Sequence, residues 1–264
     1  MNSLKWINTI AFLAMVGVNV AANVIPIGGN TTGEVSKAYP NLFTPAPVTF
    51  GIWGVIYAFM LAFVIYQWGF IGSSAVSSLI RSKVSFFFLI SCLLNIAWIF
   101  TWHFRRIELS TLFIALLLIS LIFITKGIRL VNGSLLTYLM VNVGFDIYLG
   151  WIIAATIANV SVMLTKLNWN RWGIPEMVWT IIILIVGALI ASAIVISENR
   201  YFAGLAVAWA YVGIMIKHLS LSGYAGRYIP VVIVAAVGIA MIICAGAFRL
   251  IVPNRKFGMM GSNT

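Results

Sequence analysis

From Val48 to Phe70 the chain reads VTFGIWGVIYAFMLAFVIYQWGF, a stretch without a single Asp, Glu, Lys or Arg. Such a stretch can cross the hydrocarbon core of a bilayer as an α-helix, which takes about 20 predominantly apolar residues. A transmembrane strand would instead alternate apolar and polar residues over about ten positions. Because lipid offers no hydrogen-bond partner to backbone N–H and C=O groups, the stretch predicts a membrane-spanning helix and excludes a β-barrel.

Similar apolar runs repeat along the whole chain, which is 62% hydrophobic and only 8% charged. Soluble domains carry about 25% charged residues, so that class is excluded. The first run resembles a signal peptide, but it is long enough to stay in the membrane as a helix. The chain is therefore predicted to be an all-α, polytopic membrane helix bundle with about eight transmembrane helices. They are expected at residues 6–25, 48–70, 84–103, 109–128, 136–165, 175–197, 201–218 and 229–251.

Basic residues outnumber acidic ones by 16 to 5, which gives a formal net charge of +11. They lie singly or in pairs at the ends of apolar runs, as anchors and topology signals do, and no nucleic-acid partner is predicted. More Lys and Arg residues lie on the side of the membrane that holds both termini, Arg255 and Lys256 among them, than on the other side. Both termini are therefore expected in the cytoplasm, in what we expect to be a bacterial cell membrane.

The connection between the first two helices, residues 26–47, is the longest in the chain. It begins with Pro26, is rich in glycine and proline, and carries one charged pair, Glu34 and Lys37. Long loops in compact bundles are usually functional. We therefore predict that residues 26–47 form a lid.

The sequence lacks the usual constellations of catalysis and metal binding. Its two histidines, His103 and His218, have no Cys, His or Glu at ligand spacing, and there is no Gly-rich phosphate loop or nucleophile elbow. We predict no catalytic residues, no metal and no required cofactor.

Aromatic and amide side chains recur at helical spacing inside the apolar runs. At about 100° per residue, they share one face in each of the second, third and fifth helices. One interpretation is a ligand pocket; the other is that Trp and Tyr line membrane interfaces while Asn joins helices by hydrogen bonds. The candidate ligand-binding residues are Trp53, Tyr57, Asn95, Trp98, Tyr148, Trp151 and Asn159.

Asn142, Asp146 and Gly150 lie on the other side of the fifth helix, which gives this helix two faces unsuited to lipid. Asp146 is the only acidic residue well inside a predicted span, and a carboxyl group there is a functional hypothesis by default. One interpretation is proton coupling in a transporter. The other is structural, with the carboxyl protonated or hydrogen-bonded to a neighbouring helix.

Three motifs resemble signatures of the tryptophan-rich sensory protein / translocator protein (TspO/MBR) family. FGIWGVIY (50–57) is similar to the family's second helix, and LNIAW (94–98), followed by Arg105 and Arg106, is similar to its third. YLGW and AATIAN, within 148–159, resemble its fifth helix. The resemblance covers roughly residues 5–168. It divides the chain into a TspO-like five-helix bundle at 1–168 and a three-helix C-terminal membrane extension at 169–264.

The resemblance implies a ligand-binding or sensory membrane protein whose five helices enclose a pocket beneath the lid. It also implies a flat hydrophobic ligand, such as a porphyrin or haem, with membrane lipid as the surroundings and a homodimer as a further expectation. Tyr148 lacks the basic neighbour of the pattern proposed for cholesterol contact. Two alternatives remain open: a secondary transporter that uses Asp146 in proton coupling, and a structural subunit whose last three helices dock on another protein.

Overall fold

The computed structural model describes residues 2–25, 27–71, 73–129 and 134–252. Within these residues the secondary structure is helical, without strands, and eight helices are long and apolar enough to cross a membrane. The predicted all-α fold with eight spans is confirmed. The spans are α1 (Asn2–Val24), η2 (Pro47–Gly51) with α3 (Ile52–Gln67), α4 (Ser74–His103), α5 (Ile107–Arg129), α6 (Leu135–Thr137) with η3 (Tyr138–Asn142) and α7 (Val143–Lys166), α8 (Glu176–Glu198), α9 (Tyr201–Leu219) and α10 (Ile229–Ile251).

The start of α4 differs most from the sequence expectation, because the helix begins at Ser74 and not at residue 84. The added segment, SAVSSLIRSK, is too polar to be recognised as part of a span, but it contains no Pro or Gly to stop a helix. Arg81 in this segment is buried, and its Nη1 donates to the carbonyl oxygen of Gln67 at 3.0 Å. The extension therefore places a cation at the C-terminal end of α3, where the helix dipole favours it.

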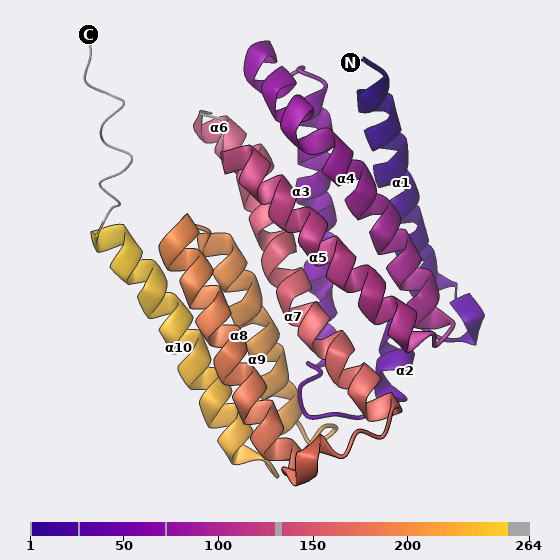
Figure 1. Cartoon of the computed structure of the whole chain (residues 1–264), viewed down its shortest axis with the longest axis vertical. Helices are drawn as coiled ribbons and strands as arrows, with labels where there is room; N and C mark the ends of the chain where they lie inside the picture. The colour runs from indigo at the N-terminus through magenta and orange to yellow at the C-terminus, as the bar shows by residue number, and fades with distance from the viewer. Residues whose placement is uncertain (1, 26, 72, 130–133, 253–264) are drawn as a thin grey trace.

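The helices form two groups that lie side by side (Figure 1). The first group contains α1, α3, α4, α5 and α7, and the second contains α8, α9 and α10, with α7 and α9 in contact across the boundary. Because the number of spans is even, α1 begins and α10 ends on the same side. Arg255 and Lys256, which entered the charge count, lie outside the described residues, so the cytoplasmic location of the termini stays a prediction.

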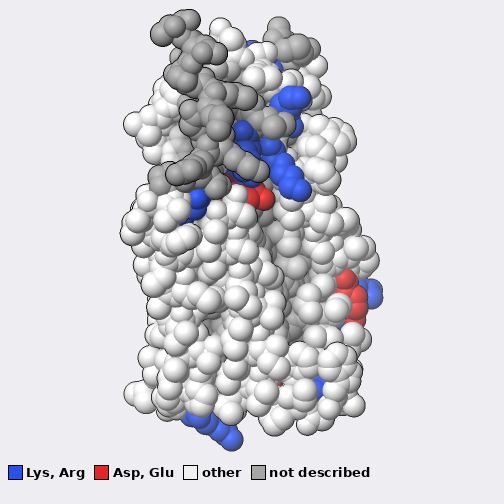
Figure 2. Space-filling view, turned by 60° about the vertical axis from the view of Figure 1, so that its left-hand side comes forward, with Lys and Arg blue, Asp and Glu red and all other residues white. Residues whose placement is uncertain are grey.

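Charged side chains are distributed as a membrane protein requires. On the face shown in Figure 2, most visible Lys, Arg, Asp and Glu side chains lie in the upper part, a smaller group lies at the right-hand edge below mid-height, and basic side chains lie near the lower end, while the centre of the face carries none. Apolar side chains on the outside of the helices, such as Leu93, Val186 and Val237, are exposed. In lipid these exposed groups have an apolar environment, so they need no further protein partner.

Glycine allows α7 and η2 to approach α9 closely. A methyl group at Gly150 of α7 would lie 2.8 Å from the Cα atom of Ala203, and one at Gly213 of α9 would lie 2.8 Å from the Cβ atom of Thr49. Both distances are too short for a carbon–carbon contact. These positions therefore fix how near the second helix group can lie to the first.

A buried ion pair also joins α7 to α9. Arg200, at the start of α9, donates from Nη1 to the Asp146 carboxylate of α7 at 2.6 Å, and both side chains are at most 6% exposed. Arg200 also donates to the Thr125 carbonyl of α5 at 2.6 Å and to Glu198 at 3.1 Å. Of the interpretations given for Asp146, the structure therefore shows the link to a neighbouring helix.

Replacing Gly150 by alanine is expected to destabilise the fold by about 1–3 kcal/mol, because the added methyl group overpacks the contact with Ala203. Gly17→Ala in α1 is the matched control, since nothing lies within 4 Å of the added methyl group there. Both changes gain the same helix propensity. Thermal unfolding in detergent measures the difference, and equal midpoints for the two variants would contradict the tight contact.

Asp146→Ala is expected to destabilise the protein by about 1–3 kcal/mol, because it leaves the buried Nη1 donor of Arg200 without its partner, with Glu198 as the remaining carboxylate. Glu108→Ala serves as the control: it removes a carboxylate from the exposed pair with Lys166, where solvent screens the charges, and little change is expected. Denaturant unfolding of the two variants checks this. Similar losses would show that burial of the Asp146 pair is unimportant.

Candidate functional site

Five of the predicted aromatic residues come together between α3, α4 and α7. Trp53 is at the centre: its ring stacks on Trp98 and Tyr57, with centroids 5.8 and 5.6 Å away. It meets Tyr148 and Trp151 edge-on, at 5.8 and 6.3 Å. Stacked and edge-on pairs are the arrangements that aromatic rings prefer, each worth about 0.5–1.5 kcal/mol beyond burial. The cluster therefore fixes the orientation of the indoles.

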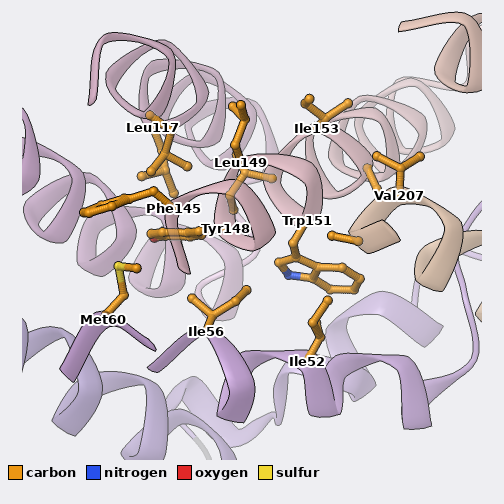
Figure 3. Close-up of a cluster of buried hydrophobic side chains, with 14 of the residues drawn as sticks. Ile52, Ile56, Met60, Leu117, Phe145, Tyr148, Leu149, Trp151, Ile153 and Val207 are labelled. Carbon is orange, nitrogen blue, oxygen red and sulfur yellow. The ribbon is translucent and has the colours of Figure 1, made fainter. Parts of the chain in front are cut away.

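Figure 3 shows how α7 carries two of these rings. Tyr148 and Trp151 point toward Ile56 and Ile52 of α3, whereas Leu149 lies on another side of α7, nearer α5. All these side chains are buried, with exposures of at most 9%. Asp146 and Gly150, which the sequence places on the other face of this helix, are buried as well.

Asn95 braces the cluster from inside the bundle. Its Nδ2 donates to the Tyr148 hydroxyl at 3.0 Å, and its Oδ1 accepts from Asn19 of α1 at 2.7 Å. Asn95 is fully buried, so these bonds satisfy a polar group that would otherwise be costly in an apolar interior. Asn19 was not predicted, because a single amide in an apolar run does not reveal its partner.

Asn159 lies near the other end of α7. Its Oδ1 accepts from the hydroxyl groups of Ser110 and Thr111 on α5, at 3.1 and 3.2 Å. The NH₂ end is therefore the one left to other partners.

A cavity of about 40 Å³ adjoins the aromatic cluster. Of the seven predicted residues, Trp53, Trp98, Trp151 and Asn159 line it. Tyr57, Asn95 and Tyr148 do not line it and pack behind the indoles. Phe50 and Trp102 follow the same helical spacing as the predicted residues of their spans, so this spacing could have identified both. The other lining residues, all outside the predicted set, are Thr32, Ser36, Phe43, Thr44, Pro45, Phe50, Trp102, Ala154, Ala155, Ala158, Val162, Ala210 and Ile214.

Two indole N–H groups in the cavity wall lack a hydrogen-bond partner among the described residues: Trp98 Nε1 and Trp151 Nε1. The two side chains are only 4% and 2% exposed. A buried donor without a partner costs about 1–3 kcal/mol. The wall is thus mostly apolar, and two of its indoles hold an N–H group that is buried without a partner in this arrangement.

The predicted lid is an ordered segment wherever the structure describes it, from residue 27 to 47; Pro26 lies outside the described residues. It contains a 3-10 turn, η1 (Ile27–Gly29), and one short helix, α2 (Thr32–Lys37). Thr31 and Glu34 form a capping box at the start of α2, and hydrogen bonds from the Thr31 backbone and side chain hold the pKa of the Glu34 carboxyl below its usual value. Phe43 lines the cavity from the part that follows. The segment therefore covers this end of the bundle.

The second helix group holds the lid segment in place. The Leu42 carbonyl accepts from His218 Nε2 at 2.9 Å, and the Leu42 amide donates to Glu176 at 3.0 Å. The Asn41 carbonyl accepts from the Tyr224 hydroxyl at 3.0 Å. Burial, with a smaller effect of the Glu176 charge, raises the pKa of Tyr224 to about 12, so the hydroxyl is a donor at neutral pH.

Further along, the same helix group binds the end of the lid and completes the cavity. The Ala46 amide donates to the Gly213 carbonyl, and Trp209 Nε1 donates to the Thr49 carbonyl, both at 2.9 Å. Ala210 and Ile214 line the cavity from α9. Sequence reasoning missed these two, because an apolar residue in an apolar span looks the same whether it faces lipid or a cavity.

Comparison with known proteins adds a family assignment. The model of a family described as TSPO-like protein matches residues 5–249, and comparisons with curated proteins and with solved structures find no match. The match extends past the region of the three motifs, through α8 and α9 into α10. The division of the chain at residues 168 and 169 stays a prediction. Because the match covers almost the whole chain, this membrane protein belongs to the TSPO-like protein family.

Proposed function

We propose that this protein binds a flat hydrophobic small molecule, such as a porphyrin or haem, between α3, α4, α7 and α9. The observation that carries the proposal is the cavity wall, which contains four indoles, two of which have an N–H group without a partner among the described residues. Aromatic faces bind a flat ring system by stacking, and the N–H groups can donate hydrogen bonds to acceptor atoms on the edge of that ring system.

Such a ligand requires the lid segment to move. The cavity of about 40 Å³ is far below the roughly 300–1,000 Å³ of typical small-molecule sites. Five residues of the lid segment line its wall: Thr32, Ser36, Phe43, Thr44 and Pro45. Their displacement enlarges the space without disturbing the aromatic cluster, which is fixed by α3, α4 and α7.

Binding or sensing is proposed as the function, and not catalysis. The cavity wall consists of apolar, hydroxyl and amide side chains, which bind and orient a ligand. Asn159 is its one amide, and its free NH₂ end is suited to a carbonyl or carboxylate edge. The wall is thus suited to selecting a molecule by shape and by a few polar contacts.

The transporter alternative stays a hypothesis. Asp146 does not line the cavity; it lies on another face of α7, paired with Arg200 at the contact with α9. Helix packing alone accounts for a carboxylate in that position. Ligand binding is therefore the function that the geometry supports best.

Single substitutions of Trp53, Trp98 and Trp151 by phenylalanine are expected to weaken porphyrin binding. At Trp98 and Trp151 the loss of one hydrogen bond, about 0.5–1.5 kcal/mol, corresponds to roughly 2- to 13-fold in Kd. At Trp53 the reduced stacking area weakens binding. Titration of the purified protein with a porphyrin, followed by its absorbance, measures the three Kd values.

Trp172→Phe is the matched control, because Trp172 is 73% exposed and packs only with Trp169 and Trp179 among the aromatic residues. Its porphyrin affinity is expected to equal that of the wild type. Unchanged affinity in all three test variants would refute the assignment of the pocket. A wild type that binds no porphyrin would remove this class of ligand.

A further inference from the structure

A groove of about 600 Å³ lies outside the lid segment, opposite the indoles. Its first wall is the lid and the start of η2, between Gly33 and Phe50, and its second wall is the end of α9 with the turn that follows, between Ile216 and Tyr224. The groove is large enough for part of a small molecule, which the closed cavity is not.

The polar groups of the groove are cationic or hydroxyl. Lys37 and Lys217 lie on opposite walls, and the described lining residues include no Asp or Glu. The hydroxyl groups come from Ser36, Thr44, Ser220, Ser222 and Tyr224; those of Thr44 and Tyr224 donate to Asn41, and those of Ser220 and Ser222 are bonded to each other. Lysine ammonium and hydroxyl groups together are the donors that carboxylates and phosphates accept from.

Lys217 lacks a carboxylate partner within salt-bridge distance, as far as the described residues go. Its Nζ is 3.5 Å from the Asn41 carbonyl oxygen and 5.5 Å from the centre of the Tyr224 ring. The nearby Glu176 carboxylate binds the Leu42 amide and lines a neighbouring space, not the groove. The ammonium group therefore retains donors for an anion.

The position of Lys217 in the last turn of α9 also suits the helix dipole and a side chain that reaches toward the membrane surface. That explanation accounts for a lysine at this position. It does not account for a second lysine in the wall of the same groove, or for the hydroxyl groups that line the groove with the two lysines.

The groove and the cavity share part of their walls. Ser36, Thr44, Pro45 and Phe50 line both spaces, so only the side chains of the lid and of η2 separate them. One molecule can therefore extend from the indoles to the lysines once the lid moves.

We infer that the groove is a binding site for an anionic head group, a carboxylate or a phosphate, of an amphipathic molecule whose apolar part enters the cavity lined by tryptophans. The inference rests on the proposed function and adds the charge of the ligand to it. The head group can belong to a soluble carboxylic acid or to an anionic phospholipid, and the two sources are separated by experiment.

The test compares a porphyrin dicarboxylic acid with its uncharged dimethyl ester on the full chain, in nanodiscs of phosphatidylcholine. The wild type is expected to bind the diacid more tightly than the ester. Lys217→Gln is expected to weaken diacid binding by about tenfold and to leave the ester unchanged, because only the acid uses a charge-assisted hydrogen bond. Lys37→Gln acts in the same direction with a smaller effect, since Lys37 is exposed.

Two variants control for damage to the fold. Lys217→Arg keeps the charge and is expected to retain the preference for the diacid. Lys83→Gln removes an exposed charge from the part of α4 near the opposite end of the bundle and is expected to change nothing. Loss of the preference in either control would overturn the role given to the Lys217 charge.

Native mass spectrometry of the wild type and of Lys217→Gln counts bound phosphatidylglycerol. It tests whether a lipid is the source of the head group. Retention that is lost in the variant identifies the head group as that of a phospholipid. Equal affinity of the wild type for diacid and ester, with no lipid retained, would overturn the anion site and leave the cavity proposal standing. If neither porphyrin binds, the ligand proposed for the cavity is wrong, and lipid retention alone decides the anion site.

Discussion

The contact between α7 and α9 decides how the two helix groups fit together. Lipid is as apolar as a leucine side chain, so burial of apolar surface does not drive helices together inside a bilayer. Close packing and hydrogen bonds must do so. Here Gly150 permits the approach of the Ala203 backbone, and Arg200 binds the carboxylate of Asp146. A contact that is both close and directional sets the distance and the register of α9.

The register of α9 then determines the site. Ala210 and Ile214 complete the wall of the cavity, and His218 reaches the carbonyl of Leu42. Among the described residues, the lid segment makes five long-range hydrogen bonds with this helix group and the turn after α9, and three with the end of α4 and the turn after it, at Asn30 and Thr32. The aromatic cluster and its cover thus belong to different parts of the chain, which lets the cover move while the cluster stays fixed.

Sequence reasoning predicted the helices well, because a run of apolar residues long enough to span lipid has few alternatives. It also found the indoles and amides that meet between α3, α4 and α7, since helical spacing places them on one face and the motifs resemble those of a family. It missed the partner of Asp146, because Arg200 is 54 positions away and local spacing carries no information about pairing between distant helices. The polar start of α4 was missed for another reason: hydropathy identifies the part of a helix in lipid, and not the helix itself.

The stacked indoles have an optical consequence. The rings of Trp53 and Trp98 lie 5.8 Å apart at an angle of 29°, and Trp151 is the next neighbour at 6.3 Å from Trp53. At such distances electronic excitation passes readily from one indole to the next, so the three rings emit as one unit. A coloured molecule that reached any one of them would darken all three, and the chain thus carries its own fluorescent reporter at the cavity.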